Sequence, residues 1–162
     1  MEVVEGRASV ADVDEFVERL GAVGDEHGAA VQAFDARYVV GREHLERAVA
    51  LAERARERGE AVADDPAVEI LLYAAGRRQI TDALEMGVSE GGCPVVAVAV
   101  GGDEAGAAAA LRELLAPAET LGEYDPGRVR DYFGISDREL AATAGDLADI
   151  VRERVALLVV NR

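Results

Sequence analysis

The chain has 162 residues, of which 50% are apolar, 30% are charged and 4% are aromatic. These fractions exclude a disordered polyacid and predict one domain whose core is built from small and aliphatic side chains. The 32 acidic and 17 basic residues give a formal net charge of −15, which opposes long-range attraction to a polyanion.

The first part of the chain alternates short strands with amphipathic helices. Residues 2–7 and 29–34 have the pattern of strands, and a helix is predicted between them from Val10 to about Val23. Residues 42–59 form the clearest helical pattern, because apolar side chains recur three and four positions apart and a glycine follows. The predicted apolar stripe of this helix comprises Leu45, Ala48, Val49, Ala52 and Ala55.

The next elements surround the most hydrophobic part of the chain. Asp64 and Asp65 are suited to cap a helix that starts at Pro66, and Gly76 interrupts its apolar run. Residues 94–100, PVVAVAV, predict a strand that is buried on both faces. Four further helices and a closing strand are predicted at 103–115, 124–133, 136–142, 145–155 and 156–160 respectively.

The interleaved elements predict an α/β or α+β fold. We expect one domain over residues 1–162, with a small mixed sheet of four or five strands packed with about six to eight helices. The pattern leaves parallel and antiparallel pairing open.

The cysteine count, the N-terminus and the choice of basic residue indicate the cellular compartment and the habitat of the protein. The single cysteine, Cys93, excludes an internal disulfide and a cysteine-based zinc site, and we expect it to be buried or half-buried. No signal-like or membrane-spanning segment is evident, so we expect a cytoplasmic protein. All 17 basic residues are arginine, which together with the acid excess predicts a halophilic microbe; an ordinary acidic cytosolic protein is the alternative.

A glycine-rich turn, GGDEAG, follows the most hydrophobic strand and superficially resembles a phosphate loop. It lacks the lysine and hydroxyl residue of a Walker loop and the spacing of a dinucleotide site, and Asp103 and Glu104 would repel phosphate. An ordinary strand-to-helix turn with Asp103 as the N-cap is favoured.

No group of residues predicts catalysis or metal binding, and no cofactor is expected. His27 and His44 lack a second ligand at helical spacing and a nearby nucleophile, so an exposed or half-buried structural histidine is favoured for each. The acidic pair at 64–65 is explained by capping.

The segment GRRQ, residues 76–79, is the strongest candidate for binding. Gly76 allows another backbone to approach closely, and the fixed charge and planar donor groups of Arg77 and Arg78 suit phosphates and bases. Gln79 adds an amide for a base edge. The alternative is that both arginines pair with local acids such as Glu69 or Asp82.

Two longer segments resemble a known family. EILLYAAGRRQITDALEMGV (69–88) and VQAFDARYVVGREHLERAVALA (31–52) are similar to the small accessory subunit of the KEOPS complex, the family of the PRPK-binding protein. The resemblance covers most of the chain and is weakest after Ala116. It implies a non-enzymatic KEOPS accessory-subunit domain.

The resemblance also implies partners and site residues. KEOPS adds the threonylcarbamoyl group to the adenosine beside the anticodon of tRNAs that read ANN codons. The family's subunit binds a small atypical serine/threonine kinase/ATPase of the complex and captures tRNA by its single-stranded 3′ CCA end. On this basis we expect Arg77, Arg78 and Gln79 to contact tRNA, with His44 and Arg42 as weaker candidates.

Two other functions stay open from the sequence. One is a small α/β enzyme or nucleotide-binding protein that uses the GGDEAG turn, which would bind ATP or another nucleotide by itself. The other is a purely structural adaptor that makes no contact with nucleic acid.

Overall fold

The computed structural model describes residues 1–160, and the side chains of residues 1–158. Three strands form one antiparallel sheet in the order β1-β3-β2, so the fold is α+β. The elements follow in this order: β1 (Glu2–Val10), α1 (Val13–His27), β2 (Ala30–Asp35), η1 (Ala36–Tyr38), α2 (Arg42–Glu57), α3 (Pro66–Ala75), α4 (Ile80–Ala83), η2 (Leu84–Met86), β3 (Gly91–Val100), α5 (Glu104–Leu114), α6 (Pro126–Phe133), α7 (Asp137–Ala142) and α8 (Leu147–Val160).

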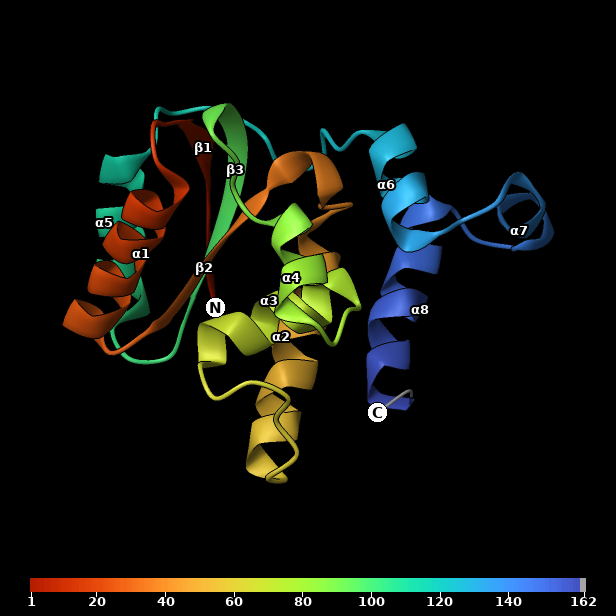
Figure 1. The fold of residues 1–162 in the computed structure, drawn as a ribbon, viewed down its shortest axis with the longest axis horizontal. Helices are drawn as coiled ribbons and strands as arrows, with labels where there is room; N and C mark the ends of the chain where they lie inside the picture. The colour runs from red at the N-terminus through yellow and green to blue at the C-terminus, as the bar shows by residue number, and fades with distance from the viewer. Residues whose placement is uncertain (161–162) are drawn as a thin grey trace.

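The central strand β3 divides the core into two halves. Its side chains alternate between the faces of the sheet, so Val96 and Val98 belong to one core while Val95 and Ala97 belong to the other. Figure 1 shows α1 and α5 on one face of the sheet and α2, α3 and α8 on the other. The prediction that this strand is buried on both faces is confirmed.

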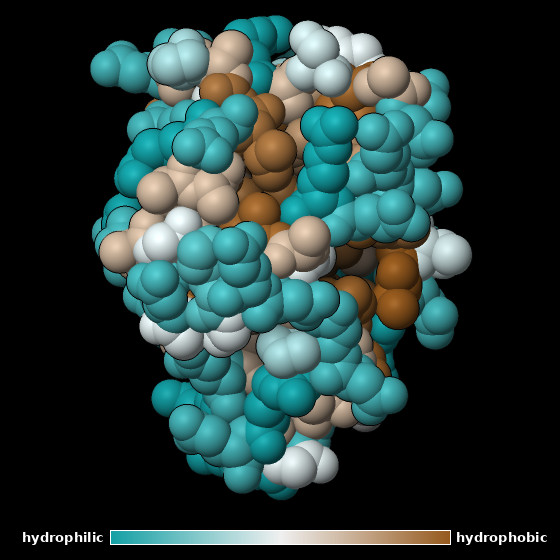
Figure 2. Space-filling model, turned by 90° about the vertical axis from the view of Figure 1, so that its left-hand side faces the viewer, coloured by the Kyte–Doolittle hydropathy of each residue, from teal (hydrophilic) through white to brown (hydrophobic). Residues whose placement is uncertain are grey.

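The surface over α1 and α5 is mostly hydrophilic. In Figure 2, polar residues cover most of this side, and apolar residues are visible in the hollows between them. No helix in the described residues is long and apolar enough to cross a membrane.

Two predictions about strands are wrong. Residues 1–160 contain three strands instead of four or five, and their sheet is antiparallel throughout instead of mixed. The segment 156–160, predicted as a closing strand, is the last part of α8. It is helical because Val151, Val155 and Leu158 recur at helical spacing and are buried in the core beside α2 and α3.

Local signals predicted most helix boundaries correctly. The Asp65 carboxylate caps α3 through the Ala67 N–H, and the Ser136 hydroxyl caps α7 through the Glu139 N–H. The whole predicted stripe of α2 is buried, and so is Cys93. Asp64 does not cap the helix with its side chain; its carbonyl accepts a hydrogen bond from Arg56.

Candidate nucleic-acid interface

The turn after α3 depends on a glycine. Gly76 has φ 62° and ψ 31°, a left-handed conformation that glycine adopts without strain. Its N–H donates to the carbonyls of Leu72 and Tyr73, and the Arg77 N–H donates to Leu72 at 3.0 Å. A Cβ on Gly76 would lie 3.4 Å from the carbonyl oxygen of Arg154 in α8. The close backbone approach predicted here is therefore made by the chain's own last helix.

Arg77 is turned inward and links this turn to α6. Its guanidinium donates to the Tyr132 carbonyl and lies over the Tyr132 ring, 4.5 Å from the ring centroid. The Tyr132 hydroxyl in turn donates to the Asp82 carbonyl at 2.8 Å. Burial raises the pKa of Tyr132 to about 12, so the phenol stays protonated and keeps this hydrogen bond at neutral pH. Arg77 thus holds the turn against α6.

Arg78 and Gln79 face outward beside a hollow of about 450 Å³. One wall is the loop 62–65, the other is the segment 78–81, and Val68 and Leu72 of α3 line it between them. Ile80 is 47% exposed there. The hollow combines apolar surface with an amide, a guanidinium and the carboxylates of the loop.

A buried acid holds the loop wall in place. Glu69 is fully buried, and its carboxylate accepts hydrogen bonds from the N–H groups of Val62, at 2.9 and 3.0 Å, and Ala63, at 3.1 Å. Several charge-assisted bonds are what a buried carboxylate needs to offset its desolvation. Glu69 therefore serves the loop, whereas the sequence suggested it as a salt-bridge partner of Arg77 or Arg78. The only signal for this role is an acid inside an otherwise apolar run.

His44 lies in the core behind the turn. The prediction of an exposed or half-buried histidine is wrong for His44, which is fully buried. Its Nδ1 accepts from the Val40 N–H at 3.3 Å, so Nε2 carries the proton and donates to the Ala74 carbonyl at 2.8 Å. Burial lowers the pKa of His44 to about 4, so the ring is neutral. His44 supports the end of α3 from inside.

Arg42 stands apart from the other candidates. It is exposed at the start of α2, where its Nε lies 3.8 Å from Glu46, and it does not line the hollow described above or the one described next.

A second hollow, of about 330 Å³, lies on the α8 side of the turn. Its lining includes three arginines, Arg77, Arg78 and Arg154, and the apolar residues Phe133 and Leu157. The structure therefore brings together Gly76, Arg77, Arg78 and Gln79, with His44 behind them.

The GGDEAG turn is occupied by the chain's own carboxylates. Asp103 accepts from the Gly106 N–H at 3.0 Å, which lowers the pKa of this carboxyl, and Glu104 accepts from the Gly101 N–H at 2.7 Å. His27 lies 3.4 Å from Asp103 on the other side. The amides that would bind a phosphate already have anionic partners. Residues 1–160 contain no group of three or more His, Cys, Asp or Glu side chains arranged to hold a metal ion.

The chain matches a known protein family. The family model described as "Kinase binding protein CGI-121" matches residues 9–158, which includes the Gly76 turn, the loop 62–65 and nearly all of α8. No curated protein matches the chain.

Proposed function

Because the chain belongs to the CGI-121 family of kinase binding proteins, we propose that it is the non-catalytic KEOPS subunit that binds and regulates a small atypical serine/threonine kinase/ATPase. The family match over residues 9–158 carries this proposal. The burial of His44 supports a non-catalytic role, since its ring is bonded inside the core and is out of reach of a substrate. The kinase's own active site supplies the chemistry.

Kinase binding is tested by co-purification with the small kinase of the same organism. We expect a stoichiometric complex and a change in the kinase's ATPase rate when the subunit is added. Two separate elution peaks, with an unchanged ATPase rate, would contradict the proposal.

We further propose that the hollow beside Arg78 captures the 3′ CCA end of tRNA. Single-stranded ends are bound by stacking and by hydrogen bonds to base edges, and cytosine and adenine both carry an exocyclic amino group. The Ile80 and Val68 side chains offer apolar surface for a base, while the oxygens of Gln79 and Asp64 offer acceptors for its amino group. Arg78 supplies a donor for the phosphate.

The net charge of −15 is compatible with such a small site at high salt. At about 1 M salt the Debye length falls to about 3 Å, so repulsion from distant carboxylates is screened while groups in contact still attract. Arg77 and His44 then act indirectly by holding the turn, and Arg42 stays a weaker candidate.

The tRNA role is tested by binding at high salt, with intact tRNA beside tRNA trimmed of its CCA end. We expect binding only to the intact tRNA. Arg78→Glu should weaken it by about 1–3 kcal/mol, the range of a charge-assisted contact. Arg112→Glu is the matched control, because Arg112 is an exposed arginine on α5, across the sheet.

Other outcomes separate the alternatives. Failure to bind either tRNA, with the kinase still captured, would assign the structural-adaptor role. Equal affinity of Arg78→Glu and the unaltered chain would remove Arg78 from the site. ATP binding by the chain alone would revive the nucleotide-binding reading, which the occupied GGDEAG turn disfavours.

A further inference from the structure

The two edges of the sheet are treated differently by the rest of the chain. An edge strand presents unpaired backbone N–H and C=O groups, which proteins usually cover. At β1, Arg7 and Ala116 exchange two hydrogen bonds of 2.8 Å, and Glu5 binds the N–H groups of Thr120 and Leu121. Within residues 1–160, no strand or bridge pairs with the outer edge of β2.

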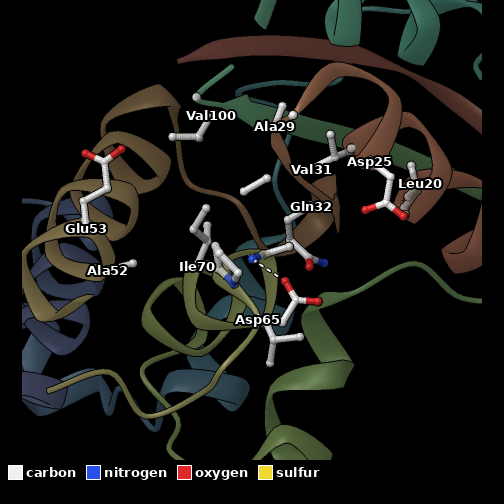
Figure 3. A pocket seen from close by; sticks show the side chains of 18 of the residues that line it. Leu20, Asp25, Ala29, Val31, Gln32, Ala52, Glu53, Asp65, Ile70 and Val100 are labelled. Carbon is white, nitrogen blue, oxygen red and sulfur yellow. Dashed lines mark hydrogen bonds between the residues drawn. The ribbon is translucent and has the colours of Figure 1, made fainter. Parts of the chain in front are cut away.

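A groove of about 550 Å³ opens along this uncovered edge. Residues 29–32 at the start of β2 line it, α1 forms one wall, and α2 with the start of α3 forms the other (Figure 3). Its surface is mainly apolar and includes Val17, which is 52% exposed although its helical spacing matches that of the buried residues of α1. The remaining large apolar side chains of the lining are Leu20, Val31, Val68, Ile70 and Val100.

One backbone acceptor of β2 is covered only by a neighbouring side chain. Gln32 lies in the middle of the groove (Figure 3), and its amide donates to the Ala33 carbonyl at 2.9 Å. The carbonyl faces away from β3, because Arg7 bonds outward to Ala116 and the alternating antiparallel pattern, followed across β3, also turns Ala33 outward. A side chain can rotate away, so the carbonyl is available to an incoming strand.

The charges around the groove are unbalanced. Asp25, Glu53 and Asp65 line it, against a single arginine, Arg56. The Arg56 guanidinium is directed to the Ala63 and Asp64 carbonyls, at 3.4 and 2.9 Å, so it is engaged with the loop. The groove therefore favours an occupant with positive charge.

We propose that this groove binds an extended segment of a partner protein as a fourth strand on β2, with apolar side chains alternating with Lys or Arg. Strand addition supplies backbone partners to the open edge, and alternate side chains give specificity. The apolar face of the added strand lies against Val17 on the α1 wall, while its basic face meets Glu53 and Asp65 on the opposite wall. The groove shares only Asp65 and Val68 with the hollow beside Arg78, so it can be tested separately from tRNA binding.

The probe is a fluorescein-labelled peptide, Val-Arg-Val-Arg-Val-Arg, titrated into the full chain in about 1 M KCl, where general attraction to an acidic protein is screened. Its control has proline in place of the central valine, which keeps the charge but removes one backbone donor. We expect the control to bind at least about tenfold more weakly, because it cannot complete a strand ladder. Amide hydrogen exchange at Val31 and Ala33 should slow when the first peptide binds.

Two pairs of variants locate the site. Val17→Arg and Glu53→Arg should each lower the affinity at least about tenfold, by blocking the groove and by reversing one of its charges. Leu84→Arg and Glu18→Arg are the matched controls and should change it less than about twofold. Leu84 is 55% exposed, close to the exposure of Val17, and Glu18 is an exposed acid of α1 outside the groove.

Three results would overturn the proposal. Equal affinity of the two peptides would show that charge alone accounts for binding and that no strand is added. Unchanged affinity in Val17→Arg would place the peptide elsewhere. Self-association of the chain that Val17→Arg abolishes, with no peptide binding, would assign the groove to a second copy of the chain.

Discussion

His44 makes the stability of the protein depend on pH. Its pKa falls from an ordinary 6.5 to about 4 in the folded chain, because burial disfavours the charged ring. Between these values the unfolded chain binds more protons, so stability is complete above pH 6.5 and is lost as the pH falls toward 4. We predict a loss of up to roughly 3 kcal/mol over this window, measured by denaturant unfolding at each pH.

A pair of variants isolates this effect from the titration of the carboxylates. His44→Gln keeps a neutral donor and acceptor in the core, so its stability should vary less over the same window. Leu84→Gln changes an exposed side chain that does not ionise and should keep the wild-type dependence of stability on pH. If the stability of His44→Gln depended on pH as the wild-type stability does, His44 would not be the source of this dependence.

Tyr73 carries a hydroxyl that the fold does not satisfy. The side chain is fully buried in α3, and its oxygen has no hydrogen-bond partner among the described residues. Because an unpaired buried polar group costs about 1–3 kcal/mol, Tyr73→Phe should leave the free energy of unfolding unchanged or raise it. Tyr132→Phe is the control and should lose about 1 kcal/mol, since its hydroxyl donates to Asp82. A clear loss in Tyr73→Phe would mean that this hydroxyl has a partner.

At the scale of elements, the two adjacent arginines have separate roles. Arg77 ties the α3–α4 turn to α6 through the Tyr132 carbonyl and ring. Arg77→Ala should therefore lower the free energy of unfolding by about 1–3 kcal/mol, and thermal or denaturant unfolding measures it. Arg78→Ala should cost less, because Arg78 is exposed. Equal losses in the two variants would contradict this division.

The sequence predicted helices well where the spacing of apolar residues and the capping residues indicated the same element. The stripe of α2 and the Asp65 cap of α3 are both local signals, and both are confirmed. The strand prediction for ALLVV at 156–160 failed because β-branched residues favour a strand, whereas the burial of Val155 and Leu158 beside other helices keeps α8 helical. Tertiary packing overrode local propensity there.

The candidate site was predictable only in part. Gly76, Arg78 and Gln79 were evident as a polar turn after an apolar helix, and the structure places them side by side. The loop wall held by Glu69 was missed, because its bonds to Val62 and Ala63 depend on the folded path of the loop. The inward turn of Arg77 likewise depends on Tyr132, which lies 55 positions away along the chain.

For the whole molecule, the acid excess predicts stabilisation by salt. A net charge of −15 on 162 residues makes the folded chain repel itself, and added ions screen this repulsion. We expect the melting temperature to rise steadily from 0.1 to about 2 M KCl, as measured by calorimetry. A melting temperature independent of KCl would contradict both this prediction and the expectation of a halophilic source.

The position of β3 in the sheet has a consequence for the order of events during synthesis. β1 and β2 both pair only with β3, which begins at Gly91, so neither early strand has a sheet neighbour until that residue has left the ribosome. The first half of the chain must wait as helices and unpaired strands, and closing the sheet then joins segments far apart along the chain. The sheet should therefore form late in synthesis and in a single cooperative step. During that interval the apolar strands are the part of the nascent chain that a chaperone would need to shield.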